Sequence, residues 1–349
     1  MAQHHRNPDR AAYHRNALFV LAIAIAGLLG GFALVPARPV VPPLSAVPVP
    51  SPVWQQIFAR PQAARSPTNA ASSAAQAALG KRLYFDTRLS GDGRRSCATC
   101  HDPKRGFSDG RAKPLGRDGK PLRRNAPGLW NLAWSKAFYW DGREPTLEAQ
   151  ARVPIEHPNE MAGDLEAIAL TLAEDAEMRK LFAAAFPSED NISATLIVAA
   201  IAAYERSLIS PITRFDRWIG GDAAALTAQE YRGFSLFVGR AGCLSCHAGW
   251  RFTDDRFHDI GLDTDDLGRG ALREADAGPP TPRFKTPGLR RISRSAPYMH
   301  DGSLKTLEDV VRHYAGGFEQ RPSVAANIVR NLQLSASERA ALVAFLKTL

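Results

Sequence analysis

The sequence predicts an all-α protein with two related domains behind an N-terminal membrane segment, and three observations support this prediction. Apolar residues recur at helical spacing in five long segments, no alternating strand pattern of useful length occurs, and one cysteine motif is found once in each half. At 349 residues, with 45% hydrophobic and 23% charged residues, the chain can bury a sizeable core in each of two domains.

The first 72 residues predict export. Residues 1–16 carry positive charge and are expected to stay in the cytoplasm, and the uncharged run at 17–35 predicts a transmembrane anchor or a signal peptide. Val35-Pro36-Ala37 is a weak cleavage candidate, and residues 36–72 read as a Pro-rich linker. The remainder is therefore expected in the periplasm, anchored to the inner membrane if the segment is kept.

The body of the chain predicts helices at about 165–186, 193–209, 227–239, 305–315 and 335–348. Three of these begin with capping-box patterns, at Thr227 to Glu230, Thr306 to Asp309 and Ser335 to Glu338. Long Gly- and Pro-rich loops occupy 102–129 and 259–288. Loops of that length in a compact domain usually wrap a cofactor or carry a site.

All four cysteines lie in two Cys-x-x-Cys-His motifs, formed by Cys97, Cys100 and His101 and by Cys243, Cys246 and His247. A Phe-Ser-Asp or Phe-Thr-Asp follows each motif, which indicates duplicated domains at 73–225 and 226–349. This is the attachment pattern of haem c, in which two thiols add to the vinyl groups and the imidazole ligates the iron. The alternatives are a four-cysteine zinc site, two local disulfides and a thioredoxin-like redox pair. Zinc does not require the histidines, and no βαβ pattern surrounds either motif. The sequence therefore predicts two covalently bound haems c.

The charge of the chain restricts its partners only weakly. A net charge of +9 and a pI near 9.6 are compatible with nucleic acid, an anionic membrane or an acidic protein. No basic run interleaved with aromatic residues and no recognised nucleic-acid module occurs. We therefore expect no nucleic acid, and favour an acidic redox partner.

From about Leu79 onward the chain resembles the bacterial di-haem cytochrome c peroxidases and their MauG-type relatives. The matching segments occur in the same order and at the same separation, and they are Lys81-Arg82-Leu83-Tyr84-Phe85-Asp86, Arg124-Asn125-Ala126-Pro127, Tyr139-Trp140-Asp141-Gly142-Arg143, Pro158-Asn159-Glu160-Met161, Phe284-Lys285-Thr286-Pro287 and Pro297-Tyr298-Met299-His300-Asp301-Gly302. The resemblance implies an N-terminal haem that reacts with peroxide, a C-terminal haem that stores electrons, and a calcium ion between the domains.

The resemblance also implies roles for residues near the first haem. Glu160 is expected to move the proton that cleavage of the peroxide O–O bond requires. Gln150 and Pro154 occupy positions that line the same side of the haem, although ordinary helix and turn roles remain open for both. Trp140 matches the tryptophan between the two haems, where an indole can relay an electron vacancy or simply fill space.

The second iron ligands distinguish members of this family. Arg117 stands where many family peroxidases carry a distal His, and no His occurs between His101 and His157, so the first iron is expected to be open without prior reduction. At the second haem the ligand position is Tyr314, where peroxidases carry Met and MauG carries Tyr. Met299 is the competing ligand, although its place in the motif favours packing.

The family's calcium site corresponds to Asn125, Ser295 and Pro297, with Ser in place of the usual Thr. For Asn125 a turn role is the alternative. His258 is expected either to contact a haem propionate or to serve as an ordinary structural histidine.

Three functions remain open. The first is a peroxidase that reduces hydrogen peroxide with electrons from a small redox protein, such as a cytochrome c or a cupredoxin. The second is a MauG-like maturation enzyme that oxidises a residue of a partner protein, and the third is an electron carrier. Tyr314 favours the second, whereas Ala241 disfavours it because MauG carries its exit tryptophan there. Trp250 could replace that tryptophan, although a core role suits it better. We favour the peroxidase.

Overall fold

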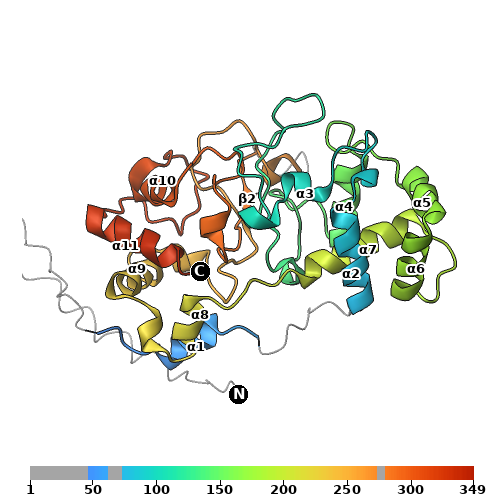
Figure 1. The fold of residues 1–349 in the computed structure, drawn as a ribbon. Helices are drawn as coiled ribbons and strands as arrows, with labels where there is room; N and C mark the ends of the chain where they lie inside the picture. Colours follow the sequence, from blue (N-terminus) through green and yellow to red (C-terminus); the bar gives the residue numbers. More distant parts are fainter. Residues whose placement is uncertain (1–45, 62–72, 273–279) are drawn as a thin grey trace, which may run out of the picture. The chain divides into compact units, whose positions relative to one another are not determined.

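The computed structural model describes residues 46–61, 73–272 and 280–349, so the predicted membrane segment lies outside the described residues. Residues 44–349 form one compact unit, which is mainly helical (Figure 1). Its longer helices are α2 (Ala74–Tyr84), α4 (Leu147–Glu156), α5 (Leu165–Glu174), α6 (Ala176–Ala185), α7 (Ala194–Ser207), α9 (Ala228–Val238) and α11 (Ala336–Leu346). The shorter ones are α1 (Pro52–Phe58), α3 (Cys97–Cys100), α8 (Arg214–Ile219) and α10 (Leu307–Arg312). Within these ranges no helix is both long and apolar enough to cross a bilayer.

The prediction of helices is confirmed in four of the five segments, and all three predicted capping boxes are formed. The segment 165–186 is two helices instead of one. Asp175 ends α5 in an extended conformation and caps α6 by accepting hydrogen bonds from the backbone N–H groups of Glu177 and Met178. Its carboxylate also accepts from Arg88 at 3.0 Å, so a tertiary contact holds the break.

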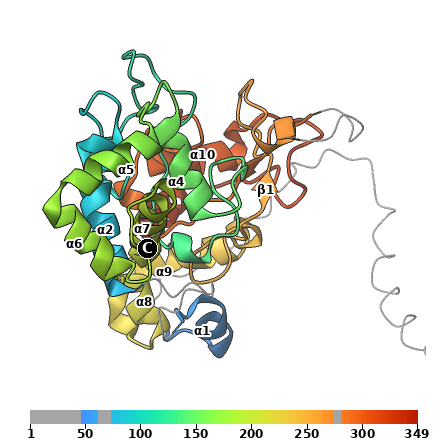
Figure 2. The same cartoon turned by 90° about the vertical axis from the view of Figure 1, so that its right-hand side faces the viewer.

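Part of the predicted linker is folded. Residues 52–58 form α1, which begins with a Ser51 cap and a proline in its first turn. Phe58 is completely buried among aromatic side chains of the C-terminal half, 5.0 Å from Phe252 between ring centroids. Figure 2 shows α1 next to α8. This short helix lies inside the predicted Pro-rich linker of residues 36–72, whose bounds stay a prediction.

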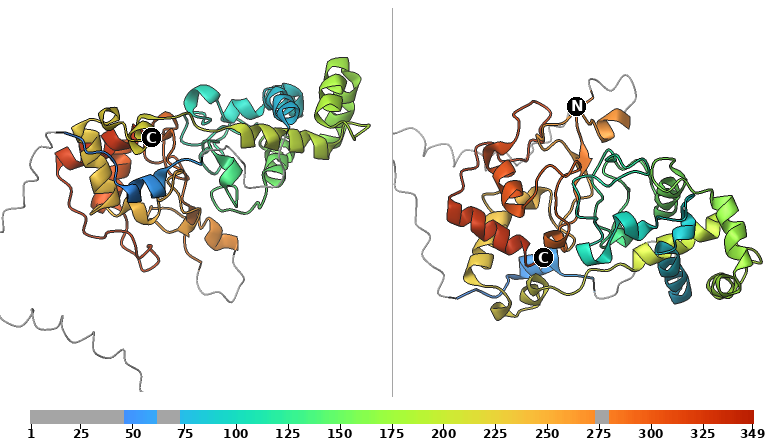
Figure 3. Two further views of the ribbon diagram at one scale, coloured as in Figure 1. Left: turned by 90° about the horizontal axis from the view of Figure 1, so that it is seen from below. Right: turned by 45° about the horizontal axis from the view of Figure 1, so that its top comes forward.

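Two crossed helix pairs form the scaffold of the two halves. In the first, α7 passes so close to α2 that a Cβ on Gly80 would lie 1.8 Å from the carbonyl oxygen of Ala200. In the second, α11 approaches α9 in the same way, and a Cβ on Gly233 would lie 1.9 Å from the carbonyl oxygen of Ala341. Only glycine permits these approaches, so the position of each glycine in the sequence determines where the two helices cross. Figure 3 shows the two pairs as separate groups of helices.

Separate apolar cores surround the two pairs. One core is drawn from residues 79–201, and the other from residues 215–349 together with Phe58. Phe215 and Trp218 of α8 belong to the second core although they precede residue 226. A domain boundary at 225–226 stays a prediction.

The loops of the two halves repeat the same backbone geometry at a spacing of 160 residues. Asn131 and Arg291 both have φ of 63°, and Gly142 and Gly302 have φ of 68° and 69°. Tyr139 and Met299 are a third such pair, with φ of 67° and 74°. The same spacing relates the helix caps Thr146 and Thr306. By this spacing Trp140 corresponds to His300, and Pro154 to Tyr314.

The only strands in the described ranges are two residues long. β1 (Phe257–His258) pairs antiparallel with β2 (Phe284–Lys285), with Phe257 opposite Lys285. This ribbon joins residue 258 to a segment near the end of the predicted loop 259–288. The backbone N–H of Lys285 also donates to the carbonyl of Trp140 at 2.7 Å, which connects the loop to the first half.

Candidate active site

A single continuous cavity is lined by both cysteine motifs. Its wall includes Cys97, Cys100, His101, Cys243, Cys246 and His247. All four cysteines carry free thiols, as addition to haem vinyl groups requires, so local disulfides are not formed. Each pair belongs to its own half, and in the part of the chain that the structure describes no potential metal site unites the four thiols. This arrangement fits two c-type haems and does not fit a four-cysteine zinc site.

The two motif histidines are held in one orientation by the same device. The Nδ1 atom of His101 lies 2.9 Å from the carbonyl oxygen of Phe107, and that of His247 lies 2.7 Å from the carbonyl oxygen of Phe252. An Nδ1–H that donates to a carbonyl leaves Nε2 unprotonated and free to bind iron. Burial lowers the pKa of both imidazoles, which favours the neutral form that a metal ligand requires.

Glu160, Gln150 and Pro154 line the same cavity, and the loop after α4 brings them together. The chain folds back on the last turn of this helix, where the backbone N–H of Met161 donates to the carbonyl of Pro154 at 3.1 Å. This turn brings Glu160 back beside α4, which carries Gln150 and Pro154. The structure thus assembles three residues that the sequence could only associate through a resemblance.

The carboxyl of Glu160 is poised to exchange a proton. Burial raises the pKa of Glu160, while His157 and Arg143 oppose the rise. Its Oε1 lies 3.7 Å from Nδ1 of His157, and a third of the side chain remains exposed. A carboxyl whose pKa is raised is better matched to proton transfer than an ordinary surface carboxylate.

Arg117, at the position where a distal His would stand, is directed to other partners. Its Nε lies 3.5 Å from a carboxylate oxygen of Asp92, and its backbone N–H donates to the carbonyl of Asn159 at 2.9 Å. Arg95 fixes the same loop by donating to the carbonyls of Leu115 and Gly116, both at 2.8 Å. Leu115 lines the cavity and Arg117 does not.

Trp140 lies at the junction of the two halves and lines the cavity. Its indole N–H donates to the carbonyl of Asn125 at 3.0 Å, while its own carbonyl accepts from the backbone of Lys285. Asn125 in turn donates its backbone N–H to the carbonyl of His300 at 2.7 Å. The indole is therefore held by the loop of the first half, and the backbone of Trp140 and of Asn125 is bonded to two segments of the second.

Tyr314 and Met299 both line the cavity in the C-terminal half. Tyr314 lies in a short π-helical turn, η8 (His313–Gly317), which continues α10. Burial raises the pKa of this phenol, and the nearby thiols of Cys243 and Cys246 add to the effect. The side chain therefore shares an enclosed apolar space with the second cysteine motif.

The three residues assigned to calcium also line the cavity. The amide nitrogen of Asn125 donates to the carbonyls of Arg111 and Ala112 at 3.0 and 3.2 Å, which leaves the amide oxygen free for a ligand. Pro297 follows Ala296 through a cis peptide bond, and Ser295 directly precedes that pair. Side-chain amide and backbone carbonyl oxygens are suitable ligands for calcium.

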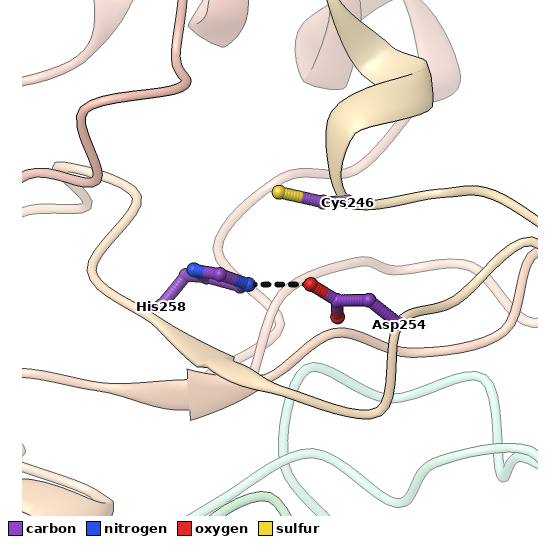
Figure 4. A group of neighbouring side chains, drawn as sticks. All are labelled: Cys246, Asp254 and His258. Atoms are coloured by element: carbon purple, nitrogen blue, oxygen red, sulfur yellow. Dashed lines mark hydrogen bonds and ion pairs between the residues drawn. The ribbon is translucent and has the colours of Figure 1, made fainter. Parts of the chain in front are cut away.

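His258 lies beside the second motif, as Figure 4 shows. Its Nε2 is 2.8 Å from a carboxylate oxygen of Asp254, and these two residues form with Cys246 a group of potential metal ligands. Its proximity to the Cys246 sulfur, followed by the hydrogen bond with Asp254, raises the pKa of His258 to about 9. A thioether to haem would remove the thiol from this group and leave the pair of His258 and Asp254.

Trp250 packs at the seam between the halves. Its ring meets that of Trp134 edge to face at 4.8 Å, and the guanidinium of Arg60 lies 5.3 Å from its centroid. Ala241 is buried in the second core, so the position of the MauG exit tryptophan carries no aromatic group here.

Two residues of the cavity wall, Tyr139 and Glu205, were not predicted from the sequence. Tyr139 donates its hydroxyl to the carbonyl of Gln150 at 3.3 Å, and Arg143 lies over its ring at 3.5 Å. Glu205 is a buried acid on α7. The repeated Asp-Gly and Pro-Gly-Leu segments, 160 residues apart, were the available signal for Tyr139, because they align it with Met299.

Two haem-attachment motifs on paired helical scaffolds, facing one cavity, define a di-haem c-type protein. The di-haem cytochrome c peroxidase family matches residues 74–224. The chain is 46% identical over 293 residues to the methylamine utilization protein MauG of Methylorubrum extorquens, covering 84% of this chain and 83% of that protein. It is 35% identical over 285 residues to the cytochrome c551 peroxidase of Nitrosomonas europaea, covering 79% and 80%.

Among solved structures, a MauG-like protein associated with microbial copper homeostasis superposes with a TM-score of 0.73 at 34% identity, covering 81% of this chain and 91% of that one. The chain belongs to the family of di-haem cytochrome c peroxidases and MauG proteins. It is an oxidoreductase of the cytochrome c peroxidase type, which confirms the resemblance seen in its sequence motifs.

Proposed function

We propose that this chain reduces hydrogen peroxide at its first haem with electrons drawn from a small redox protein. The observation that carries the proposal is the shared wall formed by Glu160, Gln150 and Pro154 beside the first haem motif. Bound haem supplies the electrons and the iron site at which the O–O bond is cleaved. The chain must then admit peroxide, handle its protons and conduct electrons.

Glu160 handles the protons in this proposal. Its carboxylate takes a proton from the oxygen of peroxide nearer the iron and returns it to the leaving oxygen, which departs as water. Gln150 would orient the substrate through its amide, and Pro154 would offer a bound haem no side-chain ligand. The anchoring of Arg117 on Asp92 supports this, because the loop offers the iron no replacement ligand from that position.

Electrons are proposed to pass from the second half to the first by way of Trp140. The indole N–H donates to the carbonyl of Asn125 and the backbone carbonyl of Trp140 accepts from Lys285, which supports a fixed position for this residue at the junction. Tyr314 is the proposed second ligand of the second iron, with Met299 packing beside it. Asn125, Ser295 and Pro297 are the proposed calcium ligands, and His258 is proposed to contact a propionate. We place the protein in the periplasm, anchored by its N-terminal segment.

A second candidate function is oxidation of a residue in a partner protein. The 46% identity to a MauG protein and the placement of Tyr314 in the cavity favour it. The buried Ala241 counts against it, whereas the Trp134 and Trp250 pair offers a different aromatic group at the surface seam. Both functions share the same peroxide chemistry and differ in where the electrons come from.

Steady-state turnover separates these functions. The haem-loaded protein is mixed with peroxide and a reduced small cytochrome c or cupredoxin, and donor oxidation is followed beside a pull-down from the source cell. Rapid, saturable donor oxidation at two electrons per peroxide supports the peroxidase. Slow donor oxidation with peroxide-dependent oxidation of a captured protein supports the maturation enzyme. Absence of any reaction with peroxide would leave only electron transfer.

A further inference from the structure

Glu205 on α7 is a buried carboxyl that no step above uses. Only 5% of the residue is exposed, and its Oε2 atom is out of reach of solvent with no hydrogen-bond partner among the described residues. The side chain lines the cavity of the first haem, together with Ile201 one turn earlier on the helix. A buried and unpartnered carboxyl is costly, so its presence calls for an explanation.

The groups that face Glu205 do not neutralise its charge. Its charge interacts electrostatically with three nearby side chains, those of Tyr84 on α2, Cys97 on α3 and Tyr204 on α7. Arg206, the neighbouring cation, is turned toward Glu148 of α4 and donates to both of its carboxylate oxygens, at 2.6 and 2.8 Å. Burial raises the pKa of Glu205 to about 8, with Arg206 opposing and Glu148 reinforcing the rise.

The second half of the molecule shows that packing does not require an acid here. The crossing of α7 over α2 at Gly80 and Ala200 corresponds to that of α11 over α9 at Gly233 and Ala341. The residues that follow correspond in turn, as Tyr204 with Phe345, Ile201 with Leu342 and Glu205 with Leu346. Leu342 and Leu346 line the cavity at the second haem as Ile201 and Glu205 do at the first. The same place is therefore occupied by a leucine at one haem and by a carboxyl at the other.

We propose that Glu205 is a redox-linked proton site of the first haem. A negative charge beside a haem favours the oxidised iron, so the carboxyl releases its proton when the first haem is oxidised. Reduction reverses this: the ferric haem with the Glu205 carboxylate takes one electron and one proton to give the ferrous haem with the Glu205 carboxylic acid. Glu205 is thus a positioning residue for charge at the first haem, and Leu346 leaves the second haem without this coupling.

The inference rests on the proposed function only in that it takes the first haem as the reactive one. Its test is a potentiometric titration of the haem-loaded protein without peroxide, repeated from about two pH units below to two above the pKa of about 8. In the wild type we expect the potential of the first haem to fall as pH rises through this window. The slope approaches about 59 mV per pH unit. This is the value for a one-electron couple that takes up one proton, because the equilibrium constant then changes tenfold per pH unit.

Three variants sharpen the test. Glu205→Gln keeps the shape but cannot ionise, and Glu205→Leu copies the second half. Both should lose the slope in this window and hold the first haem near the potential that the wild type has at low pH. Glu148→Gln is the matched control: it removes a neighbouring carboxylate, so the slope remains but moves to lower pH, because Glu148 raises the pKa of Glu205. The second haem serves as an internal reference in every titration.

An equal slope in the wild type, Glu205→Gln and Glu205→Leu would overturn the inference. If the variants fail to load haem, redox-difference infrared spectra of the wild type replace them, and absence of a protonated-carboxyl signal on reduction would likewise overturn it. Because no peroxide is present, the result is independent of turnover. A wild type that shows no slope but reduces peroxide defeats only this inference. A wild-type slope that Glu205→Gln loses, in a protein that does not reduce peroxide, defeats only the proposed function.

Discussion

Replacement of Glu160 by Gln tests the proton transfer on which the proposed function depends. Gln keeps the size and the hydrogen-bonding oxygen of the side chain but cannot accept the peroxide proton. General acid–base groups contribute about 10²- to 10⁴-fold. A third of the Glu160 side chain is exposed, so water can replace part of its role. We therefore expect a loss near the lower end, about 10²-fold in the rate of reaction with peroxide, or about 2.7 kcal/mol in the barrier.

The pH profile gives this prediction a second readout. Burial raises the pKa of Glu160, and only the carboxylate can accept a proton. The rate in the wild type should therefore rise with pH through a value above that of an ordinary glutamate and then level off. In Glu160→Gln this rise should disappear, because no group titrates at that position.

The assay is stopped-flow mixing of the haem-loaded diferric protein with peroxide under single-turnover conditions. Glu156→Gln is the control, since that exposed carboxylate lies on the same segment and pairs with Arg152 at 2.7 Å. It should react at the wild-type rate. A fully haem-loaded Glu160→Gln variant with unchanged rate and unchanged pH profile would refute the assignment of Glu160.

Three further predictions follow from the site and its supports. Tyr314→Phe should change the low-spin signal of the second haem in electron paramagnetic resonance, whereas Met299→Leu should leave it unchanged; the reverse result would assign the ligand to Met299. Denatured protein after acid–acetone extraction should retain two haems per chain in a pyridine haemochrome assay, and one haem would contradict the two-site cavity. Asp266→Asn should lower stability by about 2 kcal/mol, measured by denaturant unfolding of the haem-loaded protein, with exposed Asp265→Asn unchanged. Burial opposes the shift, but hydrogen bonding from Arg124 lowers the pKa of Asp266 to about 2. The stability that this carboxylate contributes is therefore present above about pH 4 and is lost as pH falls toward 2. Equal acid sensitivity of the wild type and Asp266→Asn would contradict this prediction.

The sequence predicted the elements that carry strong local signals. The capping boxes at Thr227, Thr306 and Ser335 set helix starts that the structure confirms, because a side-chain cap depends on residues within one turn. The break at Asp175 was missed because it depends on Arg88, which is distant in the sequence. Helix α4 was missed because Pro154 lies inside it, and proline normally argues against a helix interior.

The haem motifs were equally predictable, since the spacing of their cysteines and histidine is specific for haem attachment. The residues of the cavity wall could not be predicted in this way. Glu160 and Gln150 meet because the chain folds back on α4 through the hydrogen bond from Met161 to Pro154, a local turn that no composition or periodicity predicts. Glu205 was missed for another reason: it lies on an apolar helix, where periodicity identifies the buried face but says nothing of an acid placed on it.

The internal repeat places the difference between the two haems in a few side chains. The backbone of the loops and the helix crossings recurs in both halves, so each half offers its haem the same frame. Among these equivalent positions, two carry side chains of different chemistry. By the 160-residue spacing Pro154 corresponds to Tyr314, and by the helix crossings Glu205 corresponds to Leu346. In the proposals above, Pro154 leaves the first iron without a side-chain ligand, and Glu205 gives the first haem a group that takes up a proton. A reaction that consumes protons together with electrons would draw on both features, and both are proposed for the first half.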